Sequence, residues 1–141
     1  MRLSKAVPAI ALALFTFLAS DLEAAEKAVT LELNKLEALD RACRAYFVIK
    51  NDSPDQFGDI KLDIFIFGKD DVISRRFAIS TGQLRPGKTI VRLFDIPDLD
   101  CSTVARLLVN EVMSCMGTSG PIEGCADRLA VTARAGVAFD Y

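Results

Sequence analysis

The sequence predicts an all-β fold: an immunoglobulin-like antiparallel β-sandwich of about seven strands that follows an N-terminal signal peptide. Three observations predict it. Beyond residue 24, short segments rich in β-branched and aromatic residues alternate between apolar and polar positions, and clusters of turn residues separate them. No long helix is expected. All four cysteines lie beyond the apolar leader, which is typical of a small exported domain held by two disulfides.

The first 24 residues have the layout of a secretory signal peptide. Two basic residues precede an apolar run at 6–19, and small and polar residues follow it. Cleavage after Ala24 would leave 25–141 as a single β-sandwich domain, and cleavage after Ser20 is the alternative. The apolar run is shorter than the roughly 20 residues of a membrane-spanning helix. We therefore expect no permanent membrane anchor and a periplasmic or secreted protein.

The first three strands are expected at 28–37, 42–50 and 60–67. The first alternates between apolar and polar residues, and the second is rich in strong β-formers. Between the second and third strands, Asn-Asp-Ser-Pro-Asp at 51–55 predicts a turn, and its first three residues match the N-glycosylation sequon. The third strand becomes apolar on both faces towards its end, as expected for a strand covered on both sides.

The fourth strand is expected at 72–80. Its alternation places Ile73, Phe77 and Ile79 on one face. Arg75 falls on that same apolar face and is an exception to the pattern.

The fifth strand is expected at 89–96, after a turn that contains Pro86 and Gly87. Proline followed by glycine suits the two central positions of a type II turn. The next segment, 102–115, fits both a helix and a buried strand. We favour a short helical turn near 101–105 followed by a strand, because a sheet partner often overrides local propensity. The seventh strand is expected from 129 to the C-terminus, where apolar residues alternate strictly.

Four cysteines allow three disulfide pairings. If successive strands reverse direction, Cys43 and Cys101 lie at one end of the sandwich, and Cys115 and Cys125 lie at the other. Strand direction therefore favours the pairs Cys43–Cys101 and Cys115–Cys125. The rival bond from Cys43 to Cys115 would cross the core as in antibody domains, whose companion tryptophan is absent here.

Composition argues against catalysis and against nucleic-acid binding. The chain has no histidine, the commonest general base and metal ligand, and it has no G-x-S-x-G motif. Of its 17 basic and 19 acidic residues, two of each lie in the leader, so residues 25–141 keep a net charge of −2. A nucleic-acid-binding surface would be strongly basic. We expect no enzyme, no catalytic or metal-binding residue and no cofactor.

The sulfur cluster of Met113, Cys115 and Met116 suggests an alternative function. Soft sulfur ligands select Cu(I), so the chain could be a small-ligand or Cu(I) carrier. A disulfide cysteine flanked by packing methionines is the favoured interpretation.

Two groups of charged residues are also candidates. Asp95, Asp98 and Asp100 could bind Ca²⁺, but they lack the spacing of a calcium loop, and a solvated turn is favoured. Six basic side chains could form a positive face for a phosphate group or an acidic partner, although outward charges that protect sheet edges are the simpler interpretation. These six are Lys69, Arg75, Arg76, Arg85, Lys88 and Arg92.

A family resemblance spans Leu31 to Cys101. The chain contains L-x-L-N-K-L-E, C-R-A-Y-F-V-I-K-N-D, D-I-K-L-D-I-F-I-F, L-R-P-G-K-T-I-V-R-L-F-D-I and L-D-C, in that order. This pattern resembles small uncharacterised exported proteins of alphaproteobacterial type, often labelled Tat-pathway signal proteins, although the twin arginine is missing here. The middle is similar to FxLYD-type extracytoplasmic β-sandwiches, with Phe-Ile-Phe-Gly at 65–68 in place of their aromatic-aspartate ending.

The first resemblance implies an accessory role near envelope proton-channel energisers and assigns no functional residue. Together with the leader and the cysteines, it leads to one expected function. We expect a non-catalytic periplasmic protein-interaction or accessory module of the cell envelope, stabilised by two disulfides, with an envelope protein as its partner.

Overall fold

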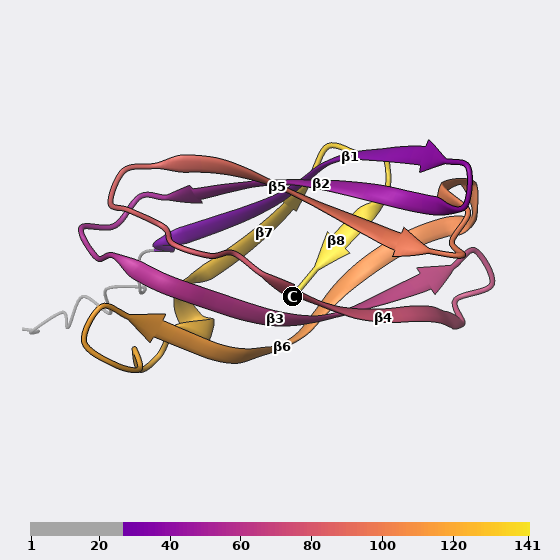
Figure 1. The fold of residues 1–141 in the computed structure, drawn as a ribbon. Helices are drawn as coiled ribbons and strands as arrows, with labels where there is room; N and C mark the ends of the chain where they lie inside the picture. The colour runs from indigo at the N-terminus through magenta and orange to yellow at the C-terminus, as the bar shows by residue number, and fades with distance from the viewer. Residues whose placement is uncertain (1–26) are drawn as a thin grey trace, which may run out of the picture.

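The strands of the computed structural model form two four-stranded sheets packed face to face (Figure 1). The model describes residues 27–141, so the predicted signal peptide at 1–24 lies outside the described residues. The strands are β1 (Val29–Leu39), β2 (Ala42–Asn51), β3 (Phe57–Gly68), β4 (Ile73–Ser80), β5 (Thr89–Pro97), β6 (Val104–Gly117), β7 (Leu129–Ala133) and β8 (Ala138–Asp140). Among the described residues, no helix has the length and apolar character needed to cross a membrane.

The sheet orders confirm the predicted β-sandwich. One sheet has the order β5-β2-β1-β7 and the other has the order β4-β3-β6-β8. The ambiguous segment at 102–115 is resolved as expected, since a short 3-10 turn at Cys101–Thr103 leads into β6. The Asp100 side chain caps this turn by accepting a hydrogen bond from the Ser102 backbone N–H.

The predicted single strand from 129 to the C-terminus is wrong in one respect. The chain breaks at 134–137, where Gly136 has a φ of 77°, and continues as β8 in the opposite sheet. β7 pairs in parallel with β1, and β8 pairs in parallel with β6, so the sandwich is not purely antiparallel. Alternation of side chains continues across the break, which is why the sequence alone does not reveal the change of sheet. By changing sheets, the chain closes one side of the sandwich.

The core lies between the sheets and is filled by alternate residues of the long strands. Phe47 of β2 is fully buried, with its ring centroid 5.9 Å from that of Phe94 and 5.7 Å from that of Phe139. Because these three rings come from β2, β5 and β8, the aromatic cluster connects both sheets.

Both disulfides are at the ends of the sandwich. Cys43 is bonded to Cys101, across 58 residues of chain, and Cys115 is bonded to Cys125, across 10 residues. This is the pairing that alternating strand direction favours. The first bond connects the start of β2 to the turn after β5, and the second closes the loop after β6.

Asn51, the asparagine of the sequon, stabilises the turn after β2 through hydrogen bonds of its side chain. Asn51 is fully buried, and its side-chain oxygen accepts hydrogen bonds from the backbone N–H and the hydroxyl of Ser53 at 3.0 and 2.8 Å. Its amide nitrogen donates to the carbonyl of Asp55 at 2.8 Å. This buried amide leaves no room for a glycan in the folded protein.

The predicted face of β4 is wrong at its first residue. Ile66 of β3 pairs with Arg75, but Phe67 pairs with Ile73, so Ser74 forms a bulge. The extra residue turns Ile73 outward, where it is 52% exposed, while Phe77 and Ile79 still face the core.

Candidate functional site

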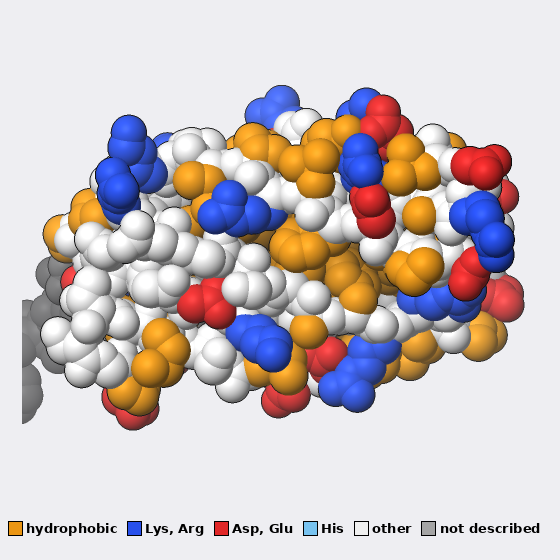
Figure 2. Space-filling model, viewed as in Figure 1, with side chains coloured by type: hydrophobic (Ala, Val, Ile, Leu, Met, Phe, Trp, Pro, Cys, Tyr) orange, Lys and Arg blue, Asp and Glu red, His pale blue; other side chains and the backbone are white. Residues whose placement is uncertain are grey.

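The side of the sandwich between β4 and β5 is open. Each of these strands is the last strand of its sheet, whereas the other side is crossed by the chain that leads from β7 to β8. Figure 2 shows hydrophobic side chains between the upper and lower layers on this face, with basic side chains above them at its left end. Two free edges therefore lie on one side of the molecule.

Two arginines bridge the open side and hold the sheets together. The Arg75 guanidinium of β4 donates to the carbonyl of Asp98, just beyond β5. Arg92 of β5 donates through Nε to the carbonyl of Thr81, just beyond β4, at 2.9 Å. Arg75, the exception in the sequence pattern, stays exposed at the open side and bonds across to the other sheet. Gly82, with a φ of 65°, leaves room for the Arg92 guanidinium, which lies 3.0 Å from where a Cβ would be.

The free edge of β5 presents main-chain groups and apolar side chains together. Two backbone bonds show which opposite residues of β2 and β5 are hydrogen-bonded pairs. They run from the Asn51 N–H to the Lys88 carbonyl and from the Asp98 N–H to the Arg41 carbonyl. In an antiparallel ladder the bonded pairs alternate, so every second residue of β5 directs its N–H and C=O away from β2. These outward-directed residues are Thr89, Val91, Leu93 and Asp95.

Val91 and Leu93 also expose their side chains. They are 50% and 48% exposed and lie on the outer face of the sheet, opposite Val48 and Tyr46 of β2. Edge strands are normally protected by charges, bulges or prolines. Pro97 ends β5 and Arg92 places one inward-pointing charge within it, but the outer face at Val91 and Leu93 carries no charge. This stretch of edge is therefore able to accept another strand.

The free edge of β4 is better protected. The bond from the Thr81 N–H to the Ile60 carbonyl shows which residues of β4 pair with β3. The residues between them, Arg76, Ala78 and Ser80, therefore direct their main-chain groups outward, away from β3. A bulge at Ser74 interrupts the strand at its start. Ile73, the exposed apolar residue of β4, lies before this bulge, and none of the three outward-directed residues is a large apolar one, so β5 is the more favourable edge for docking.

A basic cluster lies at the start of β5. Arg85, Lys88 and Arg92 surround a shallow hollow of about 330 Å³, together with Gln83 and Ile90. The turn that precedes β5 has the expected type II form, because Gly87 has a φ of 68° and Lys88 N–H bonds to the Arg85 carbonyl at 3.1 Å. Lys88 and Arg92 are four residues apart, and because side chains alternate along a strand they point to the same face.

The structure brings together three of the six basic residues singled out in the sequence. Arg85, Lys88 and Arg92 form the basic cluster, and none of them has a carboxylate partner within 4 Å among residues 27–141. Arg75 bonds to backbone carbonyls, and Arg76 bonds to the carboxylate of Asp63. Lys69 lies apart from the cluster, in the turn between β3 and β4.

The partner of Arg76 is Asp63 of β3, a carboxylate only 2% exposed on the outer side of its sheet. Arg76 donates to both of its oxygens at 2.7 and 3.2 Å, and Asn110 of β6 donates at 3.1 Å. The hydrogen bond from Arg76 holds the pKa of Asp63 below its usual range, against the opposing effect of burial. This network joins three strands and engages both oxygens of the carboxylate.

We expect Asp63→Asn to lower the free energy of unfolding at neutral pH, with a loss that shrinks in acid. A carboxylate whose folded pKa is lowered stabilises the fold above its unfolded pKa of about 3.9, and this stabilisation is lost as pH falls through the folded value. The amide does not titrate, so the difference between the two proteins begins to shrink near pH 4 and continues to shrink as pH falls through the lower folded pKa of Asp63. Urea unfolding between neutral pH and pH 3 measures the difference in free energy of unfolding between the two proteins. A difference that stays constant across that range would contradict the prediction.

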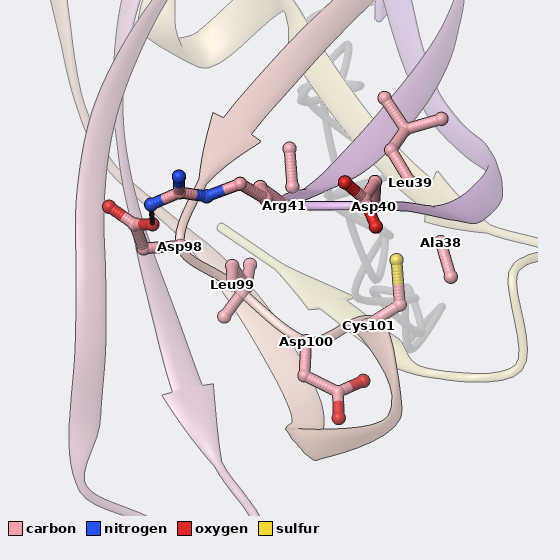
Figure 3. A pocket seen from close by; sticks show the side chains of 9 residues that line it. Ala38, Leu39, Asp40, Arg41, Asp98, Leu99, Asp100 and Cys101 are labelled. Carbon is pink, nitrogen blue, oxygen red and sulfur yellow. Dashed lines mark ion pairs between the residues drawn. The ribbon is translucent and has the colours of Figure 1, made fainter.

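The three aspartates considered for Ca²⁺ have separate structural roles. Asp95 accepts two hydrogen bonds from Arg44 at 2.6 and 2.8 Å, and Asp100 caps the 3-10 turn. A carboxylate oxygen of Asp98 lies 3.9 Å from the Arg41 guanidinium, and this pair lines a hollow of about 400 Å³ at the end of the sandwich (Figure 3). Among residues 27–141, no group of acidic, cysteine or histidine side chains could hold a metal ion.

The structure argues against the Cu(I) site considered at Met113, Cys115 and Met116. The Cys115 sulfur is bonded to Cys125, so it offers no thiolate to a metal. The two methionines are 46% and 40% exposed. The favoured interpretation, a disulfide cysteine flanked by methionines, agrees with this arrangement.

Sequence analysis missed the importance of Val91 and Leu93. A signal was present, because these residues alternate with Ile90 and Phe94 and make the strand apolar on both faces. Such a strand is normally covered on both sides. The structure leaves the outer side of this edge strand uncovered.

Comparison with known proteins shows the fold alone. No protein-family model matches the sequence, and no curated protein matches it. Among solved structures, the chain is similar to IrmA from Escherichia coli, with a TM-score of 0.58 and 11% sequence identity. The similarity covers 75% of this chain and 92% of the IrmA chain.

Proposed function

We propose that this protein is a non-catalytic protein-interaction module of the cell envelope, which docks a partner protein along the free edge of β5. The observation that carries the proposal is the combination of unpaired main-chain groups with exposed Val91 and Leu93 on one edge strand. Addition of a strand to an exposed edge is a recurrent mode of protein recognition.

The two disulfides support a location outside the cytoplasm. Such bonds form and persist in oxidising compartments, including the bacterial periplasm. We place the protein in the periplasm, in agreement with the signal-peptide layout of the sequence and its resemblance to alphaproteobacterial exported proteins. By that resemblance, an accessory role near a proton-channel energiser is part of the proposal.

Two observations support a non-catalytic role. The chain has no histidine. Its most buried carboxylate among residues 27–141, Asp63, already accepts three hydrogen bonds from neighbouring side chains. A general acid or base needs free access to a substrate proton, and Asp63 lacks that access.

The docking edge can be tested by site-specific photo-crosslinking in the cells that produce the protein. A photoreactive amino acid replaces Val91 on the edge of β5, and in a matched control it replaces Lys61, an exposed residue on the outer face of the other sheet. We expect a discrete adduct with another envelope protein at position 91 and none at position 61.

The same adduct at both positions would show that β5 is not the docking edge. Absence of an adduct at position 91, in cells where the variant is exported and folded, would contradict the proposed function.

A further inference from the structure

We infer that the partner contributes an extended strand with acidic side chains on one face and apolar side chains on the other, which adds to the sheet beside β5. This inference rests on the proposed function and specifies the chemistry of the partner. Three features of the β5 edge carry it: the direction of its main-chain groups, the exposed apolar side chains and the basic cluster.

The main-chain groups set the geometry of the added strand. Since Thr89, Val91, Leu93 and Asp95 direct their N–H and C=O groups away from β2, an incoming strand can bond to alternate residues of β5. The Arg92 guanidinium contacts this edge already, with a weak bond of 3.4 Å to the Val91 carbonyl. A competing main-chain N–H would replace that contact by a shorter one.

The side chains of β5 then set the pattern of the partner. Directly opposite residues on neighbouring strands contact one another on the same face of a sheet. On the outer face, Val91 and Leu93 continue an apolar strip formed by Val48 and Tyr46, and apolar residues of the partner would extend it. The inner face of the same strand presents Arg92, with Lys88 just before the strand, and acidic residues of the partner would lie beside these two cations.

The basic cluster favours an acidic partner over a second copy of this chain. Arg85, Lys88 and Arg92 have no carboxylate partner among the described residues, although the chain as a whole carries a net charge of −2. Antiparallel pairing of two copies of β5 about Arg92, the middle residue of 89–95, would set the two Arg92 side chains opposite each other. Like charges in that position are destabilising, whereas opposite charges direct both encounter and register.

The test uses the folded protein and three synthetic peptides of about nine residues, a length sufficient to span the edge. The first alternates glutamate and valine, the second alternates lysine and valine, and the third is the acidic peptide with proline at its central valines. We expect the acidic peptide to bind at least about tenfold more tightly than the basic one, with affinity that falls as salt increases. Proline removes main-chain donors, so the third peptide should bind weakly.

Hydrogen exchange of individual amides distinguishes strand addition from attraction by charge alone. We expect the amides of Val91 and Leu93 to exchange rapidly in the free protein and at least about tenfold more slowly with the acidic peptide bound. The amides of Ile90 and Arg92 already bond to β2 and serve as internal controls. Lys88→Glu should weaken binding about tenfold or more, while Lys61→Glu, on the other sheet, should leave it unchanged.

Equal binding of the acidic and basic peptides, or binding without slower exchange at Val91 and Leu93, would overturn the inference. Formation of a dimer by the protein alone, with loss of the fast exchange at these two amides, would overturn it in favour of a second copy. If the crosslink at position 91 in cells persists in either case, the proposed docking function stands and only the partner's chemistry is wrong.

Discussion

Phe47→Ala is expected to lower the free energy of unfolding by about 3–5 kcal/mol, a large part of the stability of a small domain. Phe47 is fully buried, and its ring packs against Phe94 of β5 and Phe139 of β8. Removing the ring leaves a cavity where the two sheets meet, and rigid strands on either side limit how far the core can collapse. Urea unfolding followed by circular dichroism measures the loss.

Val91→Ala is the matched control for this prediction. Val91 is an exposed side chain on a strand that pairs with the strand of Phe47, and substitutions at such sites usually change stability by less than about 0.5 kcal/mol. A comparable loss in both variants would show that the aromatic cluster is not the centre of the core.

Loss of the Cys43–Cys101 disulfide, through the double substitution Cys43→Ala and Cys101→Ala, is expected to cost about 4 kcal/mol. Loss of Cys115–Cys125 through the corresponding double substitution is expected to cost about 3 kcal/mol. The difference follows from loop length, because the first bond closes 58 residues and the second closes 10. A longer closed loop removes more conformational freedom from the unfolded chain. Urea unfolding of the two variants under identical oxidising conditions compares the losses.

The second disulfide variant also serves as the control for the first. The reverse order of stability would contradict the loop-length explanation and would indicate that local packing at the ends of the sandwich dominates. Cys43, Cys115 and Cys125 are all buried, so each double substitution also removes buried packing, and the predicted order rests on loop length.

The long-range disulfide has a consequence for the docking edge. Cys101 begins the 3-10 turn shortly after β5 ends at Pro97, and Cys43 lies at the start of β2, the neighbour of β5 in the sheet. The bond therefore fixes the end of β5 against the strand to which it pairs. Arg92 fixes the other half of the strand through its bond to Thr81. An edge held in this way loses little conformational freedom when a partner strand is added, which favours binding.

Much of the fold could be predicted from local pattern. The alternation of apolar and polar residues in 28–37 and 89–96, the turn at Pro86-Gly87 and the turn cluster after β2 all predict elements that the structure contains. These features depend on the period of two along a strand and on the backbone preferences of proline, glycine and asparagine. Such preferences act over a few residues, so sequence is sufficient to identify them.

The candidate site was only partly predictable. The basic residues of the cluster are visible in the sequence, but Arg76, close to Arg75 along the chain, is bound to Asp63 in the structure. Whether a cation is paired depends on which strand lies beside it, and that is set by packing between distant segments. For the same reason Ile73, expected in the core, is exposed by a bulge that one extra residue creates.

The sequence by itself determined the class of the fold, the positions of most strands and the disulfide pairing that strand direction favours. Only the tertiary structure decided that the last segment divides between the two sheets, that β4 and β5 are left as free edges, and that β5 exposes Val91 and Leu93 beside the basic cluster. The physical reason is that a strand's own sequence fixes which side chains share a face. Which strands lie beside it, and which edges stay unpaired, depends on how all the strands together bury the apolar core.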